Sequence, residues 1–153
     1  VDQAFTVGKG NSLTTNIGGK KDNVFSKPVE VTGTVAALTE GMCIDIKERP
    51  YRRIKRGRTV ILQVGSISIL VGEDRGIGGV HPAVYRYFGI EPENAKMIVV
   101  KTGGNFQYFT PICKDLILAD CPGMGQSDLR KFRWTRAPRP LYPIDSLEEW
   151  KAE

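Results

Sequence analysis

Histidine limits the chemistry open to this 153-residue chain, because the sequence contains one, His81. A hydrolytic zinc site takes two or three histidines plus a carboxylate, and no HExxH pattern occurs. A Ser-His-Asp triad would have to use His81, yet no GxSxG turn presents a serine nucleophile. His81 precedes Pro82, so we expect it to start a helix or to be a hydrogen-bonded loop residue. The residues therefore predict that this chain holds no complete hydrolytic metal site and no metal ligands.

The cysteines Cys43, Cys113 and Cys121 are odd in number and widely spaced. This pattern argues against a secreted disulfide framework, and the absence of CxxC argues against a zinc ribbon. A Cys113 or Cys121 nucleophile would need His81 as its base. Both cysteines flank apolar residues, so we expect them to be buried and inert. A reducing cytoplasm is the simplest compartment for such a chain.

Lys101 is the charged residue with the clearest functional setting. It follows the apolar residues 97–100 (MIVV) and precedes Gly103, Gly104 and Asn105. Strand ends of this kind often carry ligand-binding residues in α/β folds. A lysine whose stem packs while its head reaches solvent would give the same pattern, so both interpretations stay open.

The elements that must position these residues are short. The hairpin over residues 59–71, with Gly65-Ser66 at its turn, is the strongest local signal, and its two apolar faces predict a place deep in a sheet. Gly33 interrupts a strand and indicates a bulge or a close approach of two backbones. Asn105 is expected to cap a short helix. The expected strands are residues 12–17, 29–38, 97–100 and 116–119, and the expected helix is residues 82–88.

These elements predict an α+β domain, with a mainly antiparallel or mixed sheet and a few short helices. The chain is long enough for one domain that buries roughly two thirds of its unfolded surface. Residues 97–121 are the one place for a parallel strand–helix–strand crossover. Three prolines from residue 138 onward predict an extended tail that wraps the domain. No apolar run approaches the ~20 residues that a membrane helix needs.

Positive charge is concentrated in residues 47–58 (KERPYRRIKRGR), which hold seven Lys or Arg against one Glu, in a chain of net charge +5. A basic module that binds nucleic acid or another polyanion is one interpretation. No RNA-binding aromatic signature or helix-turn-helix accompanies the run, so a solvated loop or edge strand is favoured over a nucleic-acid partner. A dimerisation domain that presents the hairpin to a second copy is a further alternative.

Four stretches, in this order, resemble the C-terminal domain of the MlrC-like metallopeptidase family. The resemblance spans the chain from about the tenth residue onward. The stretches are Gly18-Gly19-Lys20 with residues 28–35; the hairpin at 60–71; residues 88–90, 98–101, 105–106 and 111–112; and residues 120–123 with 139–145.

The resemblance implies a zinc-dependent hydrolase whose metal ligands lie in a larger N-terminal domain, absent from these residues and preceding Val1. Because the chain starts at Val1 rather than Met, we expect a processed product or a fragment. Lys101 and Phe106 match the family pattern, whereas many members have histidine where this chain has Asn105.

The expected role is therefore an accessory domain over residues 1–153 that shapes or covers the active site. Lys101, Asn105, Phe106 and His81 are the candidate contacts to the substrate cleft. The implied partners are the N-terminal domain and a peptide or other small amide substrate, with a homo-oligomer also open. Zinc would belong to the intact protein, and the isolated chain is expected to be inactive.

Overall fold

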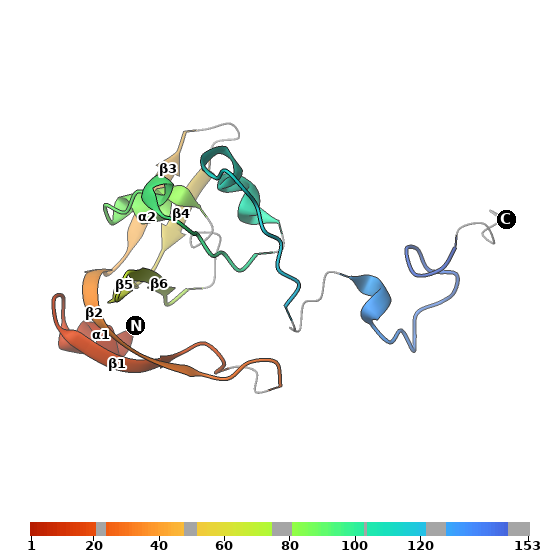
Figure 1. Ribbon diagram of the computed structural model, residues 1–153, viewed down its shortest axis with the longest axis horizontal. Coiled ribbons are helices and arrows are strands. Elements are labelled where there is room, and N and C mark those ends of the chain that lie inside the picture. The colour runs from red at the N-terminus through yellow and green to blue at the C-terminus, as the bar shows by residue number, and fades with distance from the viewer. Residues whose placement is uncertain (21–23, 48–51, 75–80, 103, 122–127, 147–153) are drawn as a thin grey trace.

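The structure is a computed structural model that describes residues 1–20, 24–47, 52–74, 81–102, 104–121 and 128–146. Within these residues, six strands form two antiparallel sheets (Figure 1). The larger sheet has the order β1-β2-β5-β6, and the smaller sheet pairs β3 with β4. The strands are β1 (Ser12–Ile17), β2 (Val29–Thr39), β3 (Met42–Ile46), β4 (Arg52–Arg56), β5 (Thr59–Val64) and β6 (Ile67–Gly72).

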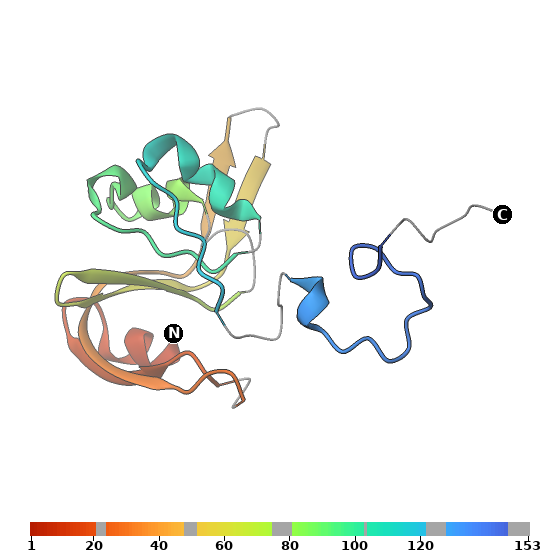
Figure 2. The ribbon, with the colours of Figure 1, turned by 45° about the vertical axis from the view of Figure 1, so that its right-hand side comes forward.

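Short helices complete the α+β architecture and confirm the expected fold class. One of them, α1, packs on the larger sheet, and another, α2, packs on the smaller one (Figure 2). None of the helices in the described part of the chain is long and apolar enough to cross a membrane. The helices are α1 (Asp2–Val7) and α2 (Pro82–Tyr87), with 3-10 turns η2 (Pro92–Asn94), η3 (Asn105–Tyr108), η4 (Thr110–Ile112) and η5 (Leu129–Lys131).

The core consists of two apolar clusters, one for each sheet. Ala4 of α1 packs with Val35, Val60 and Leu62 of the larger sheet. Val84 of α2 is fully buried against Met42, Ile46 and Ile54 of the smaller sheet. Because the long strand β2 leads directly into β3, the chain passes from one cluster to the other without an intervening domain boundary.

Gly33 of β2 lies close to the backbone of the neighbouring strand β5. A Cβ atom added at Gly33 would lie 2.5 Å from the Gln63 carbonyl oxygen, so no larger residue fits without a backbone shift. The predicted close approach is confirmed. The bulge in β2 lies further along, between Val35 and Ala37.

The hairpin forms in the predicted register, with Gly65 at φ 57° in its turn. Its first strand is central, and Val60, Ile61 and Leu62 are each only 2% exposed. Its second strand, β6, is an edge of the sheet, and Ile67 is 61% exposed. The expectation that the whole hairpin lies deep in the sheet is therefore wrong for β6, which has a strand neighbour on one side only.

Arg58 links the N-terminal helix to the end of β6. Its Nη2 donates to Asp2 Oδ1 and to Glu73 Oε1, each at 2.6 Å, and its Nε donates to Glu73 Oε2 at 3.0 Å. These hydrogen bonds hold the pKa of Glu73 below its usual value. The guanidinium also lies 5.3 Å from the centre of the Phe5 ring.

The two predicted strands on either side of η3 and η4 are not formed, and that expectation is wrong. Residues 97–100 and 116–119 are extended but pair with no strand in the described chain. Val99 is 82% exposed and Ile117 is 84% exposed, so neither segment is buried. No parallel crossover exists there, because an apolar segment becomes a buried strand only where a partner strand and a covering layer are present.

The described residues 128–146 lie to one side of the two sheets in both views (Figures 1 and 2). The expectation that this tail wraps the domain is therefore wrong. Asp128 caps η5 by accepting a hydrogen bond from the Arg130 N–H at 3.1 Å.

Candidate functional site

His81 is the N-cap of α2, as its position before Pro82 predicts. Its Nδ1 accepts a hydrogen bond from the Ala83 N–H at 3.1 Å, so the proton of the neutral imidazole is on Nε2. The side chain is buried, at 6% exposed. Gly89, at φ 72°, follows the other end of the helix. The structure therefore gives His81 a structural task that fixes the orientation of its ring.

Thr102, rather than Asn105, caps the turn that follows Lys101. The Thr102 Oγ1 accepts hydrogen bonds from the Asn105 N–H at 3.0 Å and from the Gly104 N–H at 3.4 Å. Asn105 is instead the first residue of η3, and the prediction that it caps this turn is wrong. Threonine hydroxyls commonly hydrogen-bond the backbone of a following turn, so the sequence did contain a signal for this contact.

Ring contacts hold η3 and η4 against α2. The centroids of the His81 and Tyr108 rings are 4.7 Å apart, and those of Tyr85 and Phe109 are 6.1 Å apart. Phe109 is 4% exposed, which makes it the anchor of this contact. Burial raises the pKa of the Tyr85 hydroxyl, although the nearby Arg56 lowers it by a smaller amount.

The four predicted site residues all lie on or near η3, but they differ in burial and in their contacts. His81 lies against η3, the turn that carries the half-buried Asn105 and Phe106. Lys101 lies on the segment that leads into η3, and its side chain is exposed. Among the described residues, Lys101 makes no hydrogen bond or ion pair. The packing thus joins the elements of His81, Asn105 and Phe106, while Lys101 stands at their edge.

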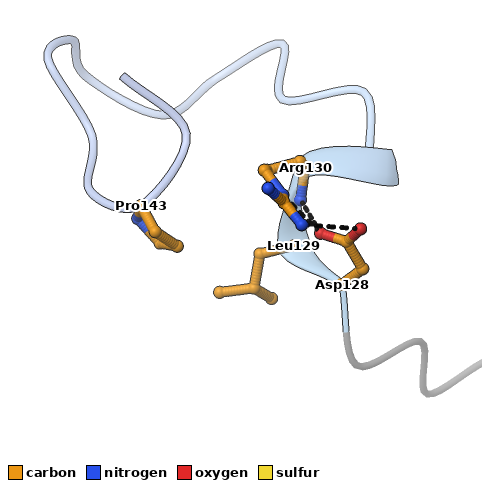
Figure 3. A pocket seen from close by; sticks show the side chains of 4 residues that line it. All are labelled: Asp128, Leu129, Arg130 and Pro143. Carbon is orange, nitrogen blue, oxygen red and sulfur yellow. Dashed lines mark hydrogen bonds and ion pairs between the residues drawn. The ribbon is translucent and has the colours of Figure 1, made fainter. Parts of the chain in front are cut away.

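A separate open hollow lies on the C-terminal tail, between η5 and Pro143 (Figure 3). Leu129 gives it an apolar wall, and Arg130 pairs with Asp128 through Nε and Oδ1 at 2.9 Å. Hydrogen bonds from Arg130 lower the pKa of Asp128, so both charges are neutralised by each other. None of the four predicted site residues lines this hollow.

Comparison with known proteins shows the family to which the chain belongs. The sequence profile of the family described as "MlrC C-terminus" matches residues 1–136. The chain belongs to the MlrC C-terminus family. It is 26% identical over 151 residues to microcystinase C of Sphingomonas sp, a match that covers 96% of this chain. The MlrC C-terminal domain spans 28% of the length of that relative.

The described residues of this MlrC C-terminal domain include no group of three or more His, Cys, Asp or Glu side chains that could hold a metal ion. The Nδ1 of His81 is engaged in the α2 cap, and the residues present do not fit the ligand set of a zinc site. Cys43 and Cys121 are exposed and Cys113 is half-buried, all as free thiols. The expectation that Cys121 is buried is wrong, and Cys113 is buried only in part.

The basic run of the MlrC C-terminal domain contributes an edge strand, as the favoured interpretation predicted. Arg53 of β4 pairs with Asp45 of β3 at 2.6 Å, and Arg58 pairs with Asp2 and Glu73. Partial burial lowers the pKa of Arg56. Residues 48–51 of the run lie outside the described residues. Arg53 and Arg58 are thus matched by carboxylates within the fold.

Proposed function

We propose that this chain is the C-terminal accessory domain of a zinc-dependent MlrC-like hydrolase that cleaves a peptide or other small amide bond in the cytoplasm. The metal ligands would lie in an N-terminal domain of the same protein, outside these residues. Two findings support the proposal: the family match over residues 1–136 and the similarity to microcystinase C, of which the chain spans 28%. The accessory domain would shape or cover the active-site cleft.

Lys101 is the residue that we propose reaches this cleft. The observation that carries the proposal is that its exposed ammonium has no partner among the described residues, although the backbone beside it is fixed by the Thr102 cap. An ammonium in a cleft can bind a substrate carboxylate or stabilise the oxyanion that forms during amide hydrolysis. Asn105 would contribute a hydrogen bond from the first residue of η3, with Phe106 as an apolar neighbour and His81 holding η3 in place.

Replacing Lys101 with alanine in the full-length protein tests this role. Loss of one group that stabilises an oxyanion lowers turnover by about 100-fold to 1000-fold in known enzymes, so we expect kcat for a peptide substrate to fall at least tenfold. Because the side chain is exposed, stability should change by less than about 0.5 kcal/mol.

Lys9→Ala is the matched control, because Lys9 is an exposed lysine near the end of α1, far along the chain from η3. Steady-state kinetics and thermal unfolding of both variants should separate the two lysines. A Lys101→Ala enzyme with the kinetics of the Lys9→Ala enzyme would contradict the proposed role.

A further inference from the structure

Two extended segments, residues 97–100 and 116–119, expose apolar side chains that soluble domains usually bury. Met97 and Val99 are 76% and 82% exposed, and Ile117 and Leu118 are 84% and 74% exposed. Single exposed apolar residues are common, but two runs of adjacent ones mark an interaction surface. The segments enter and leave the η3–η4 unit, so they belong to the same part of the fold.

Within the part of the chain that the structure describes, the backbone of both segments is also unpaired. None of the N–H and C=O groups of residues 97–100 or 116–119 forms a backbone hydrogen bond with another described residue. In the 97–100 segment, Met97 and Val99 are exposed while Ile98 and Val100 are half-buried, which is the two-residue period of a strand. A strand with free hydrogen-bonding groups and an apolar outer face is ready to pair with another sheet.

The segment that follows η4 leads toward residues 128–146, which extend to one side of the two sheets (Figures 1 and 2). The buried strand β5 of the larger sheet already has a strand neighbour on both sides. The free edges are therefore available to a partner without any rearrangement of the larger sheet.

We propose that residues 97–100 and 116–119 are the strands through which this domain docks onto the N-terminal domain of the same protein. They would extend a sheet of that domain and bury their outward side chains against it. The inference rests on the proposed function, which supplies this partner.

The identity of the occupant follows from the length of the relative and from the chemistry of the surface. The chain spans 28% of microcystinase C, so most of a protein of that length lies outside these residues. Covalent linkage gives the two domains a high effective concentration, which lets two short apolar strands suffice as the core of a contact. Docking of the 97–100 segment would also bring Lys101, the next residue, to the domain boundary.

Hydrogen exchange of the full-length protein tests the docking. Amides of residues 97–100 and 116–119 should exchange as slowly as those of β5, at least 100-fold more slowly than amides of an exposed loop. The double variant Val99→Asp with Ile117→Asp should speed exchange in both segments by at least tenfold, because it places charge in a buried contact. The control Ile67→Asp, on the exposed edge of β6, should leave both segments protected.

A milder variant guards against loss of folding. Val99→Thr with Ile117→Thr keeps strand-forming side chains and should give an intermediate loss of protection, with β5 still protected. Exchange of the two segments at loop-like rates in the unsubstituted full-length protein would overturn the docking. Protection that disappears on dilution, together with elution as a dimer, would also overturn it by assigning the surface to a second copy.

The same samples separate this inference from the proposed function. If the protein hydrolyses peptide with zinc while the two segments exchange rapidly, the docking is contradicted and the proposed function is not. Protected segments in a protein that hydrolyses no peptide would sink the proposed hydrolase and leave the domain contact standing.

Discussion

At the scale of single residues, His81 holds two elements together. Its Nδ1 caps α2 through the Ala83 N–H, and its ring lies 4.7 Å from that of Tyr108 in η3. The same ring thus sets the end of a helix and the position of the turn that carries Asn105. We interpret His81 as the support of the candidate site, with Lys101 as the residue that meets substrate.

Replacing His81 with alanine should destabilise the chain by about 1–3 kcal/mol, because both the cap and the ring contact are lost. His81→Asn restores a good N-cap residue without the aromatic ring, so it should recover about 1 kcal/mol of that loss. Urea unfolding of the two variants and of the unsubstituted chain measures the difference. Equal stability of the alanine and asparagine variants would contradict a capping role.

Local rules predicted part of this site and missed the rest. Pro82 after His81 indicates a helix start whatever the tertiary structure, and the structure confirms it. The contact of His81 with Tyr108 depends on packing between distant segments, which no local pattern encodes. We predicted a cap at Asn105, but Asn105 is the first residue of η3, Gly104 holds the N-cap position, and the Asn105 N–H donates to Thr102 Oγ1.

At the scale of elements, the β5–β6 hairpin divides into a buried strand and an exposed one. Ile61 of β5 is 2% exposed, whereas Ile67 of β6 is 61% exposed. The two isoleucines therefore differ in burial while sharing a hairpin, which makes them a matched pair for measuring the core.

Ile61→Ala should cost about 2–5 kcal/mol of unfolding free energy, since it leaves a cavity where a side chain only 2% exposed was packed. Ile67→Ala should cost less than about 0.5 kcal/mol, because its side chain already faces solvent. Chemical denaturation of both variants provides the comparison. A large loss for Ile67→Ala would mean that this edge of the sheet is covered in solution.

The sequence predicted β1, β2 and the β5–β6 hairpin but missed β3, which pairs with β4. The strands that it predicted have apolar residues at strand spacing, and Gly65 marks the turn of the β5–β6 hairpin. Residues 97–100 and 116–119 have the same apolar composition yet form no strand. Composition predicts that such segments will be buried, but it does not say whether the partner lies in this chain.

At the scale of the whole molecule, the order of the four sequence stretches predicted the family, and the family match over residues 1–136 confirms it. Charge and composition could not have done so, because a basic run also fits a polyanion-binding module, and they do not show that Arg53 pairs with Asp45 or Arg58 with Glu73. The position of residues 128–146 was also beyond prediction, since proline content indicates an extended chain but not its direction.

The most direct measurement is peptide hydrolysis by three samples: the full-length protein, the same protein treated with a zinc chelator, and the 153-residue chain alone. We expect the full-length protein to hydrolyse the peptide, to lose that activity with the chelator and to recover it when zinc is added. We expect no hydrolysis by the 153-residue chain. Hydrolysis by the 153-residue chain at the full-length rate, or full-length activity that survives complete metal removal, would contradict it.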